Sequence, residues 1–398
     1  MSDYFKQSVD KHRSTQGKYS ICSKFPLLTR DDLSIAYTPG VAAVCEAIHA
    51  DVREAYPLTM KGNSVVVLSD GSSVLGLGNI GPEAALPVME GKAILFKEFA
   101  NIDAVPLVVN TASPEEIIAV ARAIAPTFGG INLEDIGAPN CFIVEDALQD
   151  LGIPVFHDDQ HGTAIVARAA IENACKVTGK HIHELTIVIN GAGAAGSAIA
   201  KILRCVGDAT EYCTPVKELL MCDTKGIISP DRTDLNSFKQ GLLGYTNRGK
   251  RSGDLRDALK GADVFIGVSR GNLLTEDDVR TMAPDPIILA MANPIPEIMP
   301  DKAHAAGAAV VGTGRSDFPN QVNNVLVFPG LFRGALNVQA TCITDHMKMA
   351  AVNALVASVG EPTADRILPD PLDKSVAPKI AYAVAQAAIE DGVAQSGL

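Results

Sequence analysis

The chain has 398 residues, of which 47% are hydrophobic and 20% charged, and it carries a formal net charge of −12. Such a chain lacks the clustered Lys and Arg that neutralise phosphates, so we expect no nucleic-acid partner. Because no apolar run approaches the roughly 20 residues of a membrane span and residues 1–20 are polar, we expect neither a membrane segment nor a signal peptide, and predict a cytoplasmic protein of two domains.

Apolar segments alternate with amphipathic ones through the first part of the chain. Residues 63–70, 103–110 and 153–158 have the composition of buried strands, and residues 114–125 have the pattern of a helix. Strands that alternate with helices are typical of a parallel sheet covered by helices. We therefore predict an α/β substrate- and metal-binding domain over residues 1–160.

A long helix and a second series of strands follow. The helix is predicted over residues 161–179 and ends at Gly179. An Ala-rich segment, 369–394, is predicted to be helical and to pack back on the body of the protein. We predict a second domain over residues 161–398, with strands within 185–191, 219–223, 263–269, 286–294 and 309–314.

The sequence GAGAAG at 191–196 has the G-x-G-x-x-G pattern between an apolar strand and a helix. Glycines there permit a tight turn and close approach of a pyrophosphate to the helix N-terminus. This indicates a Rossmann-type NAD(P)-binding domain whose cofactor-binding residues include Gly191, Gly193, Ala194, Ala195 and Gly196.

Asp223 stands at the end of the next predicted strand. A carboxylate at this position would accept a hydrogen bond from a ribose 2′-hydroxyl and repel a 2′-phosphate, which favours NAD. Lys225 and Arg232 are close enough in sequence to weaken that preference, so NADP stays open.

A second glycine pattern, GLGNIG at 76–81, is followed directly by Pro82. It is less typical of a dinucleotide site. We interpret it as a close-packed turn that lets the following helix, which carries Lys92, approach a cleft.

Asp158 and Asp159 are adjacent in VFHDDQHGTA, at the end of a predicted strand. Neighbouring like charges repel, so a cation or a proton donor is expected near them. The alternative is that one of them caps the helix that begins near His161. Capping needs only one carboxylate and leaves the pair Glu134-Asp135 unexplained.

The eight cysteines are scattered and form no C-x-x-C pair. A thiolate zinc site or a disulfide framework would show characteristic spacings. We therefore expect reduced thiols, as in a cytoplasm.

Several segments together resemble the malic enzymes, above all their short prokaryotic form. The resemblance covers nearly the whole chain and implies oxidative decarboxylation of L-malate to pyruvate and CO₂ with NAD or NADP and a divalent metal. It also implies a homodimer. The segments, in chain order, are IAYTPGVA (35–42), VLGLGNIGPEA (74–84), PVMEGKA (87–93), INLEDI (131–136), VFHDDQHGTA (155–164), GAGAAG (191–196), MANPIPEI (291–298) and NNVLVFPG (323–330).

The resemblance implies catalytic roles for Tyr37, Lys92 and Asp158. Oxidation at C2 requires a base, and Lys92 can serve if a nearby cation or desolvation lowers its pKa. Protonation of the enolate at C3 requires an acid, which the resemblance places at Tyr37. Asp158 is then the neighbouring carboxylate that assists proton transfer.

The remaining implied residues bind the metal and the substrate. Three carboxylates offer the all-oxygen coordination that suits Mg²⁺ or Mn²⁺ rather than zinc. The implied metal ligands are Glu134, Asp135 and Asp159, and the implied substrate contacts are Asn293, Asn323 and Asn324, with Asn293 also next to the cofactor.

The chain departs from the animal enzymes at Ser73, where they carry an arginine that binds a malate carboxylate. Backbone N–H groups, the asparagines or a side chain of a partner chain would have to supply that contact.

Three other functions stay open at this point. A malolactic enzyme would keep NAD bound and yield lactate with the same metal and base. A non-catalytic NAD-binding regulator would have no need of the proton-transfer residues. A plain 2-hydroxy-acid dehydrogenase would need a His–Asp or Arg pair and no metal, and the sequence offers no convincing candidate for that pair.

Overall fold

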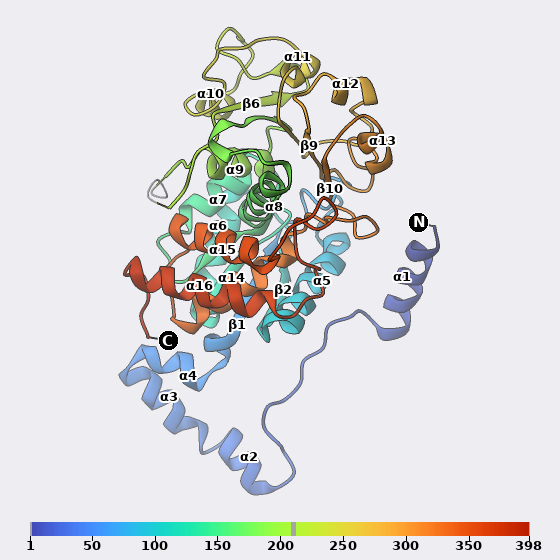
Figure 1. Ribbon diagram of the computed structural model, residues 1–398. Helices are drawn as coiled ribbons and strands as arrows, with labels where there is room; N and C mark the ends of the chain where they lie inside the picture. The colour runs from blue at the N-terminus through green and yellow to red at the C-terminus, as the bar shows by residue number, and fades with distance from the viewer. Residues whose placement is uncertain (1, 208–211, 398) are drawn as a thin grey trace.

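Two β-sheets with helices packed around them organise the chain in the computed structural model, which describes residues 2–207 and 212–397 (Figure 1). The α/β fold class predicted from the alternating pattern is confirmed. None of the helices in these described ranges is both long and apolar enough to cross a bilayer.

The first sheet has four parallel strands in the order β2-β1-β3-β4. Every residue of β1 is buried, which is the behaviour of a central strand covered on both faces. The strands are β1 (Ser64–Ser69), β2 (Asp103–Val108), β3 (Gly130–Leu133) and β4 (Val155–His157).

The second sheet has six strands in the order β10-β9-β8-β5-β6-β7, and only the β6–β7 pair is antiparallel. Each predicted apolar segment of the second half overlaps one of its parallel strands. The strands are β5 (Thr186–Asn190), β6 (Glu218–Asp223), β7 (Gly226–Ile227), β8 (Val264–Gly267), β9 (Ile287–Ala290) and β10 (Val310–Thr313).

Helices cover both sheets and join them. The C-terminal helices pack on α5 beside the first sheet, where the ring of Phe96 lies 4.7 Å from Phe328 and 5.4 Å from Phe332. The helices of the body are α4 (Ala55–Leu58), α5 (Pro82–Ala100), α6 (Pro114–Ile124), α7 (Asn140–Ala147), α8 (Thr163–Thr178), α9 (Ala194–Leu203), α10 (Ser237–Leu242), α11 (Leu255–Leu259), α12 (Glu276–Arg280), α13 (Pro300–Ala305), α14 (Phe328–Asn337), α15 (Asp345–Ser358) and α16 (Val376–Glu390).

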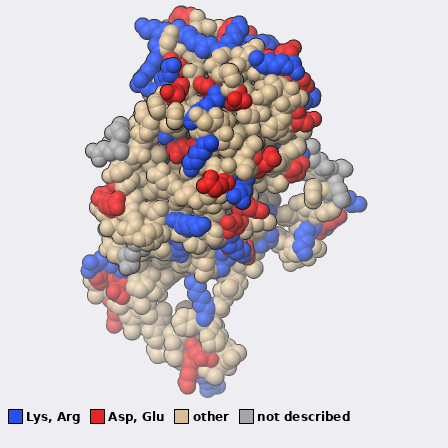
Figure 2. Space-filling view, viewed as in Figure 1, with Lys and Arg blue, Asp and Glu red and all other residues tan. Residues whose placement is uncertain are grey.

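Residues 2–51, called here the N-terminal arm, extend away from the body and contain α1 (Ser2–Thr15), α2 (Arg30–Ala36) and α3 (Val41–Ala50) (Figure 1). Figure 2 shows the arm as a projection with open space between part of it and the body. No side chain described in the arm is buried, and Leu28 is 88% exposed. Its hydrogen bonds to the body include one from the Lys18 N–H to Glu90 at 3.1 Å and one from Lys24 to Asp103 at 3.0 Å.

The expectation that all cysteines are reduced is wrong for one pair. Cys205 and Cys213 form a disulfide, while the other cysteines are free. The chain reverses direction after α9, and the backbone N–H of Val216 donates to the carbonyl of Leu203 at 3.0 Å. This reversal brings the two cysteine Cα atoms to 5.7 Å, a proximity that sequence spacing does not reveal.

Candidate active site

The carboxyl ends of β3 and β4 bring four acidic residues together. These strands are parallel neighbours, with Leu133 paired to His157, so the residues that follow them emerge at the same sheet edge. Glu134 and Asp135 follow β3, and Asp158 and Asp159 follow β4.

Lys92 projects from α5 into this group and is itself buried. Its amino group lies 3.0 Å from Oε1 of Glu134, forms an ion pair with Asp158, and stands 4.6 Å from the centre of the Phe328 ring. Burial alone would lower the pKa of Lys92, but Asp158, Glu134 and Asp159 outweigh it and raise the pKa. The direction is opposite to the one that the base role requires, because the surrounding charge is negative.

Glu134, Asp135 and Asp159 each offer a ligand oxygen, and these oxygens lie within 4.8 Å of one another. The backbone N–H of Asp135 donates to Oδ2 of Asp159 at 2.7 Å, and Asn132 Nδ2 donates to Glu134 Oε2 at 2.9 Å. Asp135 has φ of +55°, a left-handed conformation that is unusual for a residue with a side chain. The loop after β3 is thus held in a strained shape that turns its carboxylates toward the β4 loop.

Two oxygens of these carboxylates lack the donors that buried anions need. Burial raises the pKa of Asp135 to about 7 and that of Glu134 well above its ordinary value, and the charge of Asp159 adds to both shifts. Among the described residues, Asp135 Oδ2 and Asp158 Oδ1 are buried without a hydrogen-bond partner. An unpartnered buried carboxylate oxygen is costly, so this acceptor-only cluster fits a hard divalent cation.

The segment that carries Asp158 and Asp159 is a π-helical turn, Asp158–Gly162, and α8 begins only at Thr163. The helix predicted from residue 161 therefore starts slightly later, although it ends at Gly179 with φ of +69° as predicted. Neither aspartate caps the turn or α8. A Cβ at Gly162 would stand 1.9 Å from Asp158 Oδ1, so only glycine permits this arrangement.

Sequence reasoning missed Glu145, which holds the same turn from the side opposite to Lys92. Its carboxylate accepts hydrogen bonds from the backbone N–H of His157 and from the side chains of Gln160 and His161. Burial opposes ionisation of Glu145, but the interaction with His161 outweighs it and lowers the pKa to about 2. In the sequence, the sign of a buried role for Glu145 was its position as a glutamate within the apolar segment CFIVEDAL.

The structure brings Asn324 to this site, since the Cβ of Asn324 lies 3.2 Å from the position that a Cβ of Gly162 would take. Asn323 instead uses its side-chain oxygen to accept the backbone N–H of Val325 at 2.9 Å, which shapes the turn. Asn293 is exposed and lies after β9.

The GLGNIG segment approaches the second sheet closely. A Cβ at Gly76 would lie 2.5 Å from the backbone oxygen of Asn293, so a larger residue would push the two loops apart. The interpretation as a close-packed turn before the Lys92 helix agrees with this contact.

Ser73 stands where the resemblance led us to expect an arginine, and its backbone N–H donates to the carbonyl of Asp135 at 2.9 Å. Ser72 Oγ accepts the N–H of Gly137 at 2.8 Å. These bonds tie the loop after β1 to the loop after β3. The N–H of Ser73 is therefore engaged within the protein and is not the replacement carboxylate donor.

The second sheet presents the dinucleotide motif between β5 and α9. Gly191 has φ of +125°, and a Cβ at Gly196 would lie 1.8 Å from the oxygen of Gly191, so both positions require glycine. Gly193 is the N-cap of α9, and Ala194 and Ala195 are its first residues. A cavity of about 730 Å³ opens here, lined among others by Gly191, Asp223, Lys225, Lys239 and Arg270.

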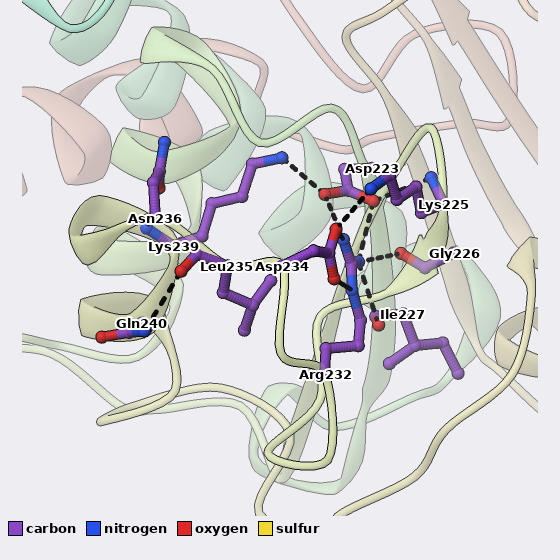
Figure 3. Close-up of polar contacts among 10 residues, drawn as sticks. All are labelled: Asp223, Lys225, Gly226, Ile227, Arg232, Asp234, Leu235, Asn236, Lys239 and Gln240. Atoms are coloured by element: carbon purple, nitrogen blue, oxygen red, sulfur yellow. Dashed lines mark hydrogen bonds and ion pairs between the residues drawn. The ribbon is translucent and has the colours of Figure 1, made fainter.

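Asp223 at the end of β6 is surrounded by cations (Figure 3). Arg232 donates to both of its oxygens, at 2.8 and 3.0 Å, and Lys239 reaches Oδ2 at 2.5 Å. Burial opposes ionisation, but these bonds lower the pKa of Asp223 to about 2. Lys225 donates its backbone N–H at 2.9 Å. Sequence reasoning anticipated Lys225 and Arg232 near Asp223 but missed Lys239, which comes from α10.

Tyr37 is not brought to Lys92 within this chain. It follows α2 in the N-terminal arm and is 66% exposed, whereas Lys92 is buried in α5 (Figure 1). The site of one chain therefore assembles the lysine and the carboxylates without the tyrosine.

Comparison with known proteins gives a consistent result. Residues 16–116 match the family model "Malic enzyme, N-terminal domain", and residues 160–389 match "Malic enzyme, NAD binding domain". The chain is 54% identical to the bifunctional malic/malolactic enzyme of Bacillus subtilis over 98% of this chain and 94% of that one.

It is also 46% identical to the NADP-dependent malic enzyme of Escherichia coli, over 99% of this chain and 54% of that one. The crystal structure of the NAD-dependent malic enzyme of Thermotoga maritima superposes with a TM-score of 0.90 at 47% identity, covering 95% of this chain and 98% of that one. The conclusion is that this chain belongs to the malic enzyme family, whose members depend on NAD or NADP.

Proposed function

We propose that the protein catalyses metal-dependent oxidative decarboxylation of L-malate to pyruvate and CO₂ with reduction of NAD or NADP. The observation that carries this proposal is the convergence of buried Lys92 with Glu134, Asp158 and Asp159 at one sheet edge. A simple hydride transfer to a nicotinamide needs no such carboxylate cluster, whereas decarboxylation of a keto acid needs a way to stabilise an enolate.

Glu134, Asp135 and Asp159 would hold the metal, Mg²⁺ or Mn²⁺, through their mutually close oxygens. A divalent cation there would polarise the keto oxygen of the substrate and offset the carboxylate charge that raises the pKa of Lys92. Lys92 would accept the proton of the C2 hydroxyl, and Asp158, its ion-pair partner, would orient the amino group.

The dinucleotide would lie across the start of α9, with its pyrophosphate at Gly191, Gly193, Ala194, Ala195 and Gly196. Asn293 and Asn324 would contact the substrate from the second sheet. Asn324 is the better supported of the two, because it adjoins Gly162 and thereby the Asp158 turn.

We also propose that the enzyme is a homodimer in which Tyr37 acts in the partner's active site as the acid that protonates C3. Tyr37 is exposed on an arm with no buried described side chain, and the arm carries exposed apolar residues such as Ile21 and Phe25. Exposed apolar surface of this kind marks an interaction site. A second copy of the chain would cover the arm and would receive Tyr37 at its own active site. In a two-fold dimer each chain would do this for the other.

Absorbance at 340 nm with L-malate and Mn²⁺, measured with NAD and with NADP, tests the reaction. Reduced nucleotide and pyruvate should appear in equal amounts and stop when a chelator is added. Reduced nucleotide that still forms in chelator would refute metal dependence, and absence of any malate turnover would refute the activity.

A malolactic activity is the second candidate, because the Bacillus subtilis relative is named a bifunctional malic/malolactic enzyme. Lactate formed from malate without net release of NADH would identify it. Lactate and pyruvate should be quantified in the same reaction, so that a mixed activity is resolved into its two rates.

A further inference from the structure

The carboxylate of Glu145 anchors the turn that carries Asp158 and Asp159. Glu145 is buried in α7 and accepts the backbone N–H of His157 at 3.1 Å, Gln160 Nε2 at 3.0 Å and His161 Nε2 at 3.0 Å. Because the ionised carboxylate can only accept, the imidazole of His161 must donate through Nε2. One acceptor thus binds the turn both before and after the two aspartates.

Hydrogen bonds to Glu145 hold this side of the turn. A cavity of about 520 Å³ lies behind it, and Glu145, Gln160 and His161 are among the residues that line the cavity. The aspartates face the other way, where Asp158 meets Lys92 and Asp159 accepts the N–H of Asp135. The side chains of the turn therefore divide between a catalytic side and an anchored side.

We propose that Glu145 is a positioning residue that holds the Asp158–Gly162 turn so that Asp159 converges with Glu134 and Asp135 on one cation. This inference rests on the metal site of the proposed function. Among the described residues, no hydrogen bond or ion pair joins Glu145 to any of the three ligands. It acts through the backbone of His157 and the side chains of Gln160 and His161. Its effect on the metal is therefore indirect and separable from metal ligation itself.

The variant Glu145→Gln isolates this role. It preserves the shape of the side chain but replaces one acceptor oxygen with an NH₂ group that faces the donors of Gln160 and His161. Groups that orient metal ligands typically change metal affinity by about 10–100-fold when altered. We expect the Kd for Mn²⁺, measured from the electron paramagnetic resonance signal of free Mn²⁺, to rise by about that factor.

Two further measurements separate positioning from general damage. NADH binding, followed by the fluorescence of the bound nucleotide in a chain without tryptophan, should be unchanged because the hydrogen bonds of the Glu145 side chain go to His157, Gln160 and His161 and not to the nucleotide motif. The matched control is Asp146→Asn, which removes a carboxylate from the neighbouring, exposed position of the same helix and should leave Mn²⁺ affinity as it is.

Gln160→Leu provides a second route if Glu145→Gln does not fold. It removes one of the three donors, leaves the carboxylate in place, and should weaken Mn²⁺ binding several-fold. The inference is overturned if Glu145→Gln binds Mn²⁺ like the wild type, if it loses NADH and Mn²⁺ binding together, or if a folded Gln160→Leu variant shows no loss. Wild-type protein that binds no Mn²⁺ would instead refute the metal site itself.

Discussion

Lys92 and Glu134, which come from a helix and a strand end more than forty positions apart in sequence, lie 3.0 Å apart in the interior. Each is buried, and each is a costly group to bury alone. Their pairing makes the lysine and the carboxylate cluster one electrostatic unit, so a change in either should alter the other.

Replacing Lys92 by alanine should reduce malate oxidation by about 10²–10⁴-fold, the contribution typical of a positioned general base. Reduction or decarboxylation of supplied keto acids should be partly retained. Steady-state rates with malate and with keto acids measure both effects.

Lys97→Ala is the matched control, since Lys97 is in the same helix but is exposed and paired with Asp103 at 2.8 Å. It should behave like the wild type. Full malate oxidation by Lys92→Ala would exclude Lys92 as the base.

Tyr37→Phe should strongly reduce turnover, and so should Lys92→Ala. If Tyr37 acts in the partner's site, co-refolding the two inactive variants should restore about a quarter of wild-type activity, because half of the randomly formed dimers contain one intact site of two.

The control for the arm is Tyr4→Phe, because Tyr4 is also exposed there. It should leave activity unchanged. If the mixed variants form heterodimers but remain inactive, either Tyr37 and Lys92 act within the same chain or Tyr37 is not the acid.

Asp135→Asn should stabilise the metal-free protein at pH 8 and do so to a smaller extent at pH 5. The raised pKa of Asp135, about 7, means that the folded state binds a proton more tightly than the unfolded state. Asp135 therefore contributes to the stability of the fold below the pKa that it has in the unfolded chain. This contribution is lost as the pH rises from that value toward 7. Asparagine also tolerates the positive φ of this position.

Thermal unfolding of both proteins at the two pH values, with chelator and with Mn²⁺, measures this prediction. Mn²⁺ should raise the midpoint of the wild type, by an amount that grows with the ratio of ion concentration to Kd, and should have less effect on the variant. Equal midpoints for both proteins at pH 8 in chelator would contradict the proposed repulsion.

Lys239→Met should lower kcat/KM for NADP by about tenfold while sparing NAD, which corresponds to the loss of one charge-assisted contact. In the structure Lys239 and Arg232 both pair with Asp223, and Lys239 supplies a positive charge to the lining of the cavity (Figure 3). A 2′-phosphate would depend on that charge, whereas a 2′-hydroxyl would need only the carboxylate.

The ratio of kcat/KM values for the two nucleotides is the measurement. Lys260→Met removes a similar lysine, paired with Asp257 at 2.9 Å outside the residues that line the cavity, and should leave the ratio constant. An unchanged ratio in Lys239→Met would remove Lys239 from nucleotide discrimination.

The strands, and the presence of acidic residues at the ends of two of them, could be predicted from the sequence because their signals are local. A buried parallel strand such as β1 is a continuous apolar run, and its polar successors mark the strand end. Glycines at 191 and 196 are required by backbone geometry within a short segment, so the motif identifies its own turn.

The contacts across distant segments could not be predicted in this way. The bonds of Glu145 to the Asp158 turn, of Lys239 to Asp223, and between Cys205 and Cys213 each join residues that only the folding of the chain brings together. Their residue types are common on protein surfaces, so no pattern distinguishes them before the partners are known.

The sequence by itself therefore determined the fold class, the nucleotide-binding turn and the chemical inventory of the site, since each depends on periodicity or on residues close in the chain. Tertiary structure alone decided which charges meet, as with Lys92 among the carboxylates, and which residue is absent from the site, as with Tyr37 on its exposed arm. The physical reason is that the pKa values and cation affinity of a buried site depend on distance and solvent exclusion, and these are properties of the assembled fold.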